Sequence, residues 1–589
     1  MRRIRKQGNP GRDVARRSLA AAPLLALAAL ACGGDREPTG AAAEAAQAAF
    51  LESSAAAVRA AIESPPDPAD DRAAAIWAEV TEIYTSRDHR PLWFDHRGPT
   101  PQGRELAIRL VDIARHGLDP ADHGGERLAL RLAELTDRDR RGDREGYARR
   151  VGRLDPSLTH GFLLLAEHLG RGQIRPSEAG IHWESEPRDI DLAKVAAAAH
   201  EEGATTTLAA VRPAHPQYEQ LERALERYRS IVKRGGWPAV PPGDTLEPGN
   251  EDPRRVVPLR HRLALEGHAT GEGDDDEASD RLSPRYDEAL AEAVRAYQRR
   301  RGLTPDGLVG GKTLDELNVS AVDRVRQIEA NLERWRWMPA NLGDRYVLVN
   351  VPRFELHVVE NGDEVMRMRV VVGEELNATP MFSDEMEYVV FNPYWNVPAS
   401  IAGEEIVPAF QRDPGYLVRN EMEVVRGWED AEVLGAHVPP SVAAQAADES
   451  SGLRIRQRPG AQNPLGRIKF MFPNEHAIYL HDTSAAHLFD ETVRLFSHGC
   501  IRVEKPVELA AWALGQPRSA VRAEMASGAG DEWRSLPQHI PVHILYFTVA
   551  VDDDGSVLFF DDHYGLDERV LAALDDRPAA ALPLLDDAG

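Results

Sequence analysis

One thiol and two histidines carry most of the chemistry that the sequence offers. The chain has 589 residues and only two cysteines, Cys32 and Cys500. Cys500 lies in the segment SHGCIR, residues 497–502, and His481 ends an earlier apolar run, residues 478–481. A cysteine beside a histidine and a glycine is typical of nucleophilic catalysis, because a base can take the thiol proton and the glycine lets backbone approach a carbonyl. We therefore predict that Cys500 is a nucleophile and not a buried apolar residue.

Two histidines could act as the base, and spacing alone leaves both open. His498 lies two residues before Cys500 and could reach it on a suitable turn, whereas the fold must bring His481 close. His498 and Arg502 would both favour the thiolate electrostatically. The planar guanidinium of Arg502 suits a substrate carboxylate, although an ion pair with Glu504 is an equal alternative.

Bulk composition bounds the class of protein. A chain of this length is expected to form several domains, and 42% hydrophobic with 28% charged residues is ordinary for a soluble protein. The net charge of -25 argues against nucleic-acid binding, which needs clustered positive charge. The acidic run 272–277 is interpreted as solvated surface, so we expect no metal and no cofactor.

The N-terminal segment predicts export from the cytoplasm. Residues 1–6 are basic and residues 19–31 form an apolar run too short to span a bilayer. The run ends at Cys32, in a segment that resembles a bacterial lipoprotein processing site except that Ala29 stands where leucine is usual. Lipidation of Cys32 is the preferred prediction, and plain cleavage is the alternative. Residues 33–70 are interpreted as a flexible tether.

Periodicity divides the remaining chain. Helical spacing predicts an all-α scaffold over residues 71–236, followed by a proline-rich linker. Residues 245–320 predict a small three-helix module whose last helix opens with a capping box at 313–316. Residues 340–575 carry many short strand patterns and predict a mostly β domain, interrupted at about 402–463 by a helical and loop-rich insertion.

These motifs resemble those of the L,D-transpeptidases with a YkuD-type catalytic domain. The resemblance is carried by His481, the SHGC segment with Arg502, and the stretches Thr379-Pro380, FNPYWNVP (391–398) and NPLGRIKF (463–470). Residues 245–320 resemble a three-helix peptidoglycan-binding domain. The resemblance implies a large periplasmic protein of multidomain α+β fold, with a mostly β YkuD-like catalytic domain and a lid insertion, an all-α scaffold and the small peptidoglycan-binding domain.

The resemblance also implies a reaction and assigns roles. Cys500 would attack the carbonyl before the terminal D-alanine of a tetrapeptide stem, and an amine of a second stem would resolve the thioester into a 3-3 cross-link. The family pattern gives the base to His481, held by a backbone carbonyl, and leaves His498 secondary. Gly499 would shape the oxyanion loop and Arg502 would bind a stem carboxylate. Weaker candidates for substrate contact are Ser497, expected mainly to hold the turn, and Tyr394 and Trp395, which could equally be core residues.

Two other readings stay open. Water could resolve the same thioester, giving an L,D-carboxypeptidase or a cross-link hydrolase. The insertion would act as a lid over the site, and how well it excludes water would decide between water and an amine as the acceptor. A non-catalytic cell-wall anchor is the other alternative. By resemblance, carbapenems should acylate Cys500. The expected partners are peptidoglycan, other cell-wall enzymes and, through Cys32, the membrane.

Overall fold

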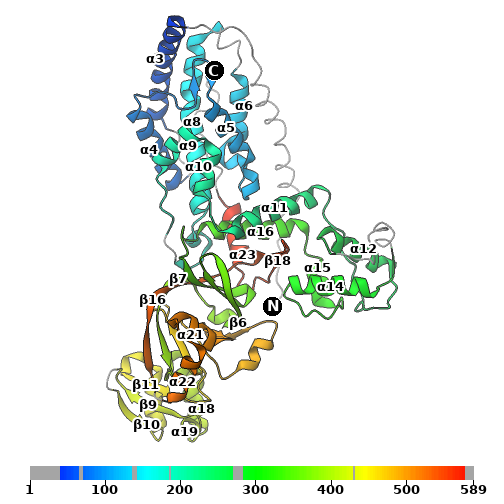
Figure 1. Cartoon of the computed structure of the whole chain (residues 1–589), viewed down its shortest axis with the longest axis vertical. Coiled ribbons are helices and arrows are strands. Elements are labelled where there is room, and N and C mark those ends of the chain that lie inside the picture. Colours follow the sequence, from blue (N-terminus) through cyan, green and yellow to red (C-terminus); the bar gives the residue numbers. More distant parts are fainter. Residues whose placement is uncertain are drawn as a thin grey trace.

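The computed structural model describes residues 40–65, 70–135, 142–184, 187–268, 283–428, 431–528 and 530–577. A helical rod, a small helical arm and a β-rich domain meet near the middle of the molecule (Figure 1). The predicted multidomain α+β architecture is confirmed. The predicted export signal, Cys32 and the acidic run 272–277 lie outside the described residues.

The rod is a bundle around one long buried helix. Its helices are α3 (Ala41–Glu63), α4 (Asp71–Ser86), α5 (Pro101–Val111), α6 (Gly125–Glu134), α8 (Arg144–Arg171), α9 (Leu192–Glu202) and α10 (Ala204–Val211). Helix α8 is buried along most of its length, as its apolar residues on several faces require. Asp155 of α8 accepts hydrogen bonds from the backbone N–H groups of Leu92 and Trp93, both at 2.8 Å, and so ties the α4–α5 connection to the bundle.

The predicted tether is wrong over most of its length. Residues 41–63 form α3, which packs along α8. Phe50, Val58 and Ile62 are buried in the bundle core, and Ser54 completes the same four-residue spacing. Side chains four apart lie on one face of a helix, so this segment has an apolar stripe that its high alanine content conceals.

The arm consists of α12 (Pro253–Leu265), α14 (Glu288–Arg300) and α15 (Gly311–Leu317) around a separate small core. The predicted capping box is wrong, because α15 already begins at Gly311 and has no side-chain cap. Thr313 is instead buried, and its hydroxyl accepts a hydrogen bond from Gln298 Nε2 at 3.1 Å. The threonine therefore fastens α15 to α14.

The β-rich domain is built on a ten-stranded sheet. Its neighbours follow the order β12-β13-β15-β6-β5-β4-β16-β7-β3, and β12 also pairs with β7, so the sheet closes on itself. The strands are β3 (Trp183–Glu184), β4 (Arg345–Asn350), β5 (Glu355–Glu360), β6 (Asp363–Gly373), β7 (Met381–Phe391), β12 (Ile468–Met471), β13 (Leu480–His481), β14 (Leu495–Ser497), β15 (Ile501–Val503) and β16 (Glu532–Leu545). Beside it lie α21 (Pro506–Leu514), α22 (Arg518–Ser527), α23 (Leu566–Asp575) and the hairpin β17 (Val549–Val551) with β18 (Val557–Phe559).

Two helices join the three parts. Helix α11 (Pro216–Lys233) falls inside the predicted scaffold, yet its buried Tyr218, Leu221 and Leu225 belong to the core of the β domain and not to that of the rod. The predicted scaffold, which ends at residue 236, thus includes a helix that packs on the β domain. Helix α16 (Ala321–Arg336) packs against α11 and buries most of its length at this junction.

The insertion between β7 and β12 is a small subdomain with its own core. The prediction of helices and loops missed its strands β9 (Met422–Arg426), β10 (Glu432–Gly435) and β11 (Leu453–Gln457), which form a four-stranded sheet with β8 (Trp395–Asn396). Its short helices are α17 (Ala399–Ile401), the π-helix Ala402–Ile406, α18 (Val407–Arg412), α19 (Tyr416–Arg419) and α20 (Pro440–Ala443). Figure 1 shows this subdomain at the end of the molecule opposite the rod.

The contact between α3 and α8 gives a test of the corrected N-terminal segment. A Cβ atom added at Gly152 would lie 2.5 Å from the carbonyl oxygen of Ser54, so Gly152→Ala must push α3 away. We expect a loss of about 1–3 kcal/mol from overpacking. If residues 41–63 were a tether, the same change would stabilise α8 by about 1 kcal/mol through helix propensity. Thermal and urea unfolding show whether Gly152→Ala lowers or raises the free energy of unfolding. Arg153→Ala, at an exposed position of the same helix, is the control.

Candidate active site

Parallel pairing of β13 with β15 brings the two predicted motifs together. In this register Leu480 lies opposite Ile501 and His481 opposite Arg502. The backbone N–H of Ile501 donates to the carbonyl of Tyr479 at 3.1 Å. Cys500, directly before β15, therefore lies beside Tyr479, directly before β13.

His481 is buried and neutral. Its Nδ1 lies 2.5 Å from the carbonyl oxygen of Asp482, which can only accept, so Nδ1 carries the proton and Nε2 is left as the acceptor. Burial, followed by the nearby charge of Arg502, lowers the pKa of His481 to about 3. The predicted backbone carbonyl is thus in place, and the imidazole is free to take a proton at any ordinary pH.

Cys500 rests as a thiol. Its thiol donates to the carbonyl oxygen of Ala477 at 3.9 Å, and the backbone N–H and hydroxyl of Tyr479 act on the sulfur to lower its pKa. Burial raises the pKa of Cys500 above its usual value, and this effect outweighs the opposing influence of Tyr479, Lys469 and Arg502. Arg502 favours the thiolate, in the predicted direction, but desolvation is the larger effect and keeps the resting group protonated.

Tyr479 and Lys469 are the residues at this site that sequence reasoning missed. Tyr479 precedes His481 by two residues in an extended segment, so the two side chains share a face, and their ring centroids lie 5.6 Å apart. Lys469 lies opposite His481 on β12 and places Nζ 3.7 Å from the centre of the Tyr479 ring. Burial lowers the pKa of Lys469. The alternation Tyr-Leu-His at residues 479–481 could have predicted that Tyr479 shares a face with His481.

A small hydrogen-bonded turn holds Cys500 in position. Ser497 Oγ donates to the carbonyl of Cys500 at 2.6 Å and accepts from the N–H of Gly499 at 3.2 Å. Gly499 has φ +112°, which only glycine adopts without strain. Thr379 Oγ1 donates to the carbonyl of Gly499 at 2.7 Å and accepts from the N–H of Gly373 at 2.9 Å. Ser497 therefore closes the turn, as expected, and Thr379 anchors it to the sheet.

The two charged neighbours of Cys500 have separate positions. His498 Nε2 lies 3.0 Å from Glu405 Oε1, so this histidine contacts the insertion. Arg502 Nη2 donates to the carbonyl of Phe496 at 3.3 Å. Glu504, the alternative partner of Arg502, is paired with Arg369 at 2.5 Å. Within the described part of the chain no carboxylate forms an ion pair with Arg502.

Tyr394 and Trp395 lie at the base of the insertion. The guanidinium of Arg456 sits 4.4 Å above the Tyr394 ring, and Asp531 accepts from the Tyr394 N–H at 3.0 Å. Trp395 packs against the core of the insertion. The contacts of Trp395 agree with the core alternative, whereas Tyr394 is half-buried and lies in no core cluster. Across the described residues, no group of three His, Cys, Asp or Glu side chains is arranged to hold a metal ion.

Family models match three parts of the chain. Residues 344–542 match the YkuD model, "L,D-transpeptidase catalytic domain", residues 78–225 match "Scaffold domain" and residues 255–317 match "Putative peptidoglycan binding domain". The chain therefore contains a YkuD-type L,D-transpeptidase catalytic domain joined to a scaffold domain and a peptidoglycan-binding domain. The resemblance seen in the sequence is confirmed.

Similar proteins carry the same description. A "Putative L,D-transpeptidase" of Haemophilus influenzae is 31% identical over 226 residues, which is 38% of this chain and 45% of that protein. The match thus spans less than half the length of this curated relative. A crystal structure of an L,D-transpeptidase (residues 123–326) from Xylanimonas cellulosilytica aligns over 52% of this chain and 99% of its own, at 16% identity and a TM-score of 0.17, and nothing is inferred from that alignment.

The protonation state of the site gives a test by alkylation. Because the pKa of Cys500 is raised, the thiolate fraction and the rate of iodoacetamide alkylation should rise about tenfold per pH unit between pH 6 and 8. Tyr479→Phe removes a donor to the sulfur and should slow alkylation by roughly tenfold, as expected for one hydrogen bond to a charged group. Peptide mass spectrometry follows the reaction, with Tyr388→Phe as control. A rate that is flat from pH 5 to 8 would reveal a preformed thiolate instead.

Proposed function

We propose that the protein is an L,D-transpeptidase that forms 3-3 cross-links in peptidoglycan through a Cys500 thioester. The observation that carries the proposal is the parallel pairing of β13 and β15, which sets His481 opposite Arg502 and Tyr479 beside Cys500, so that the histidine and the thiol belong to neighbouring strand positions. The catalytic-domain match over residues 344–542 and the peptidoglycan-binding match over residues 255–317 support this class of substrate.

The neutral pair suits acyl transfer in two proton-coupled steps. His481 Nε2 takes the thiol proton as Cys500 Sγ bonds to the carbonyl carbon that precedes the terminal D-alanine. The carbon–nitrogen bond breaks, and the imidazolium returns the proton to the departing amine of D-alanine. An amine of a second stem then attacks the thioester, His481 removes its surplus proton, and the thiol is restored as the new amide forms. A histidine whose pKa is about 3 holds the proton only briefly, which favours its rapid return.

Arg502 and the Gly499 turn are assigned supporting roles. The guanidinium of Arg502, unpaired by any described carboxylate and opposite His481 in register, would hold a carboxylate of the donor stem. The turn fixed by Ser497 and Thr379 would present the backbone of Gly499 and Cys500 to the developing oxyanion. His498 is proposed to hold the insertion over the site through Glu405.

The proposed location is the cell envelope. A domain that binds and a domain that modifies peptidoglycan would act outside the cytoplasm. No helix among the described residues is both long and apolar enough to cross a membrane. Anchoring through lipidation of Cys32 is proposed, as are contacts of the scaffold with other cell-wall enzymes.

To test the function, the mature protein and its Cys500→Ala variant are each incubated with purified disaccharide-tetrapeptide, and the products are identified by mass spectrometry. We expect a dimer that has lost one D-alanine, formed by the wild type and absent with the variant. Tripeptide and free D-alanine without dimer would reassign the protein to the L,D-carboxypeptidases. Lack of any product from both proteins would favour the cell-wall anchor. A carbapenem adduct on wild-type protein, absent from Cys500→Ala, would independently identify the nucleophile.

The bridge between His498 and Glu405 predicts how product choice can be altered. If it helps to keep water from the thioester, Glu405→Gln should raise the ratio of hydrolysis to cross-linking. The pair is about half exposed, so we expect at most about a fivefold change, corresponding to about 1 kcal/mol. Glu404→Gln, an exposed neighbour on the same π-helix, is the matched control. An unchanged ratio in Glu405→Gln would exclude a role of this contact in water exclusion.

A further inference from the structure

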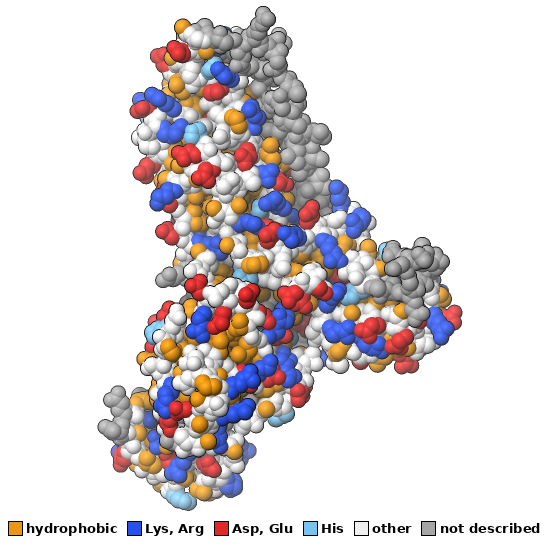
Figure 2. Space-filling model, in the orientation of Figure 1, with side chains coloured by type: hydrophobic (Ala, Val, Ile, Leu, Met, Phe, Trp, Pro, Cys, Tyr) orange, Lys and Arg blue, Asp and Glu red, His pale blue; other side chains and the backbone are white. Residues whose placement is uncertain are grey.

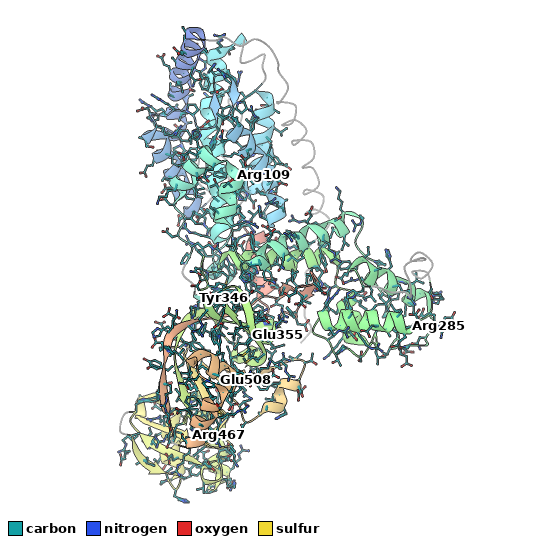
Figure 3. The ribbon with its side chains drawn as sticks, viewed as in Figure 1. Arg109, Arg285, Tyr346, Glu355, Arg467 and Glu508 are labelled. Carbon is teal, nitrogen blue, oxygen red and sulfur yellow. The ribbon has the colours of Figure 1, made fainter. Side chains whose placement is uncertain are left out.

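A second cleft lies where the peptidoglycan-binding arm meets the catalytic domain, away from Cys500. It encloses about 640 Å³ and is lined by the end of α14, the turn between β4 and β5, residues 492–494 and the β17–β18 hairpin with the segment that follows it. A cavity of roughly 300–1,000 Å³ is the size that accommodates a ligand of several residues. Glu355, labelled in Figure 3, marks the catalytic-domain wall that faces the arm.

The lining carries charge of both signs. Five arginines and four carboxylates contribute to it, and blue and red side chains gather at this junction in Figure 2. Arg299 and Arg300 come from the arm, whereas Asp552, Asp554 and Asp561 come from the catalytic domain. The pair between Arg300 and Asp554 is long, at 3.6 Å. Arg353 pairs with Glu355 at 2.5 Å and Arg299 with Glu292 at 3.0 Å, so the weakly paired charges are those that face each other across the cleft. A ligand with both carboxylate and ammonium groups could bridge these facing charges.

The walls are joined beneath the cleft, so the site is preformed. Arg301 donates to the carbonyl of Val557 on β18 at 3.1 Å and pairs with Glu266 of the arm at 2.7 Å. Its guanidinium also lies 4.5 Å from the centre of the Phe559 ring. Because this buried residue bonds to both sides, binding would not have to bring the two domains together.

Arg494 adds a positive charge that Glu355 and Glu504 stabilise only from a distance. It is 9% exposed and donates to three backbone carbonyls, those of Val370 at 3.1 Å, Glu491 at 2.8 Å and Phe354 at 3.0 Å. No described carboxylate forms an ion pair with it. A buried guanidinium that forms no direct ion pair can gain stabilisation from a ligand carboxylate. Residue 494 lies three positions before Ser497, so the cleft adjoins the segment that leads to the Cys500 turn.

We propose that this cleft binds a zwitterionic stem peptide of peptidoglycan, with the arginines facing its carboxylates and the aspartates of the β17–β18 hairpin facing its free amine. The identity of the ligand rests on the function proposed above, whereas the charge complementarity does not. A stem bound here would hold the wall polymer beside the catalytic domain through contacts distinct from those at Cys500.

The test uses full-length Cys500→Ala protein and a disaccharide-tetrapeptide whose third residue is diaminopimelate. Hydrogen–deuterium exchange should show joint protection of residues 296–303, 352–355 and 552–563. The midpoint of this protection should shift at least about tenfold in Arg299→Ala/Arg300→Ala, because two charge-assisted hydrogen bonds are lost. Arg295→Ala, on the same helix but outside the lining, is the matched control and should leave the midpoint unchanged. Amidating the carboxylates of the probe should abolish the protection.

Two results would overturn the proposal: protection confined to residues around position 500, or protection of the cleft that the double variant and amidation leave intact. Product formation by the wild type separates this site from the enzymatic function. Cleft protection without any product would sustain the binding site and reject the transpeptidase. Product formation without cleft protection would support the transpeptidase and reject the binding site.

Discussion

The register between β13 and β15 is the constraint on which the site depends. Parallel neighbours cannot be joined by a tight turn, and the chain between them passes through β14, which pairs with β6 before the Cys500 turn. A slip of one residue would turn His481 to the opposite face and separate it from Cys500. Closure of the sheet through β12 and β7 prevents that slip, because β13 is hydrogen-bonded on both sides. The fold thus fixes the geometry before any substrate binds.

Burial sets the electrostatic state of this geometry. Desolvation raises the pKa of Cys500 and lowers that of His481, so both rest uncharged. Moving a neutral pair out of water costs much less than moving an ion pair, and the nearby cations Lys469 and Arg502 supply stabilisation only as negative charge develops on sulfur or oxygen. This arrangement explains why the Cys500 thiol stays protonated at rest although Lys469 on β12 and Arg502 on β15 lie close to it.

Local patterns predicted the β domain and its motifs because short apolar strand-like runs recur along it and the SHGC segment is distinctive. The sequence could not reveal contacts that depend on distant partners. The four-residue spacing of Phe50, Ser54, Val58 and Ile62 was hidden among alanines, and only α8 shows which face is buried. The apolar face of α11 looked like that of a bundle helix, yet it packs on the β domain. The state of Cys500 depends on desolvation, which neighbours in sequence do not report.

Helix α16 explains why the rod, the arm and the catalytic domain hold one arrangement. It is polar for much of its surface yet largely buried, and its charges pair across different boundaries. Glu333 accepts from the N–H of Ile174, Arg334 pairs with Asp567 of α23, and Arg324 pairs with Glu316 of the arm. Sliding any one part would leave a buried charge unpaired, at a cost of about 3–5 kcal/mol. Domains in one chain usually move relative to each other, and this helix opposes such motion, so the cleft beside the arm and the Cys500 site keep a constant separation.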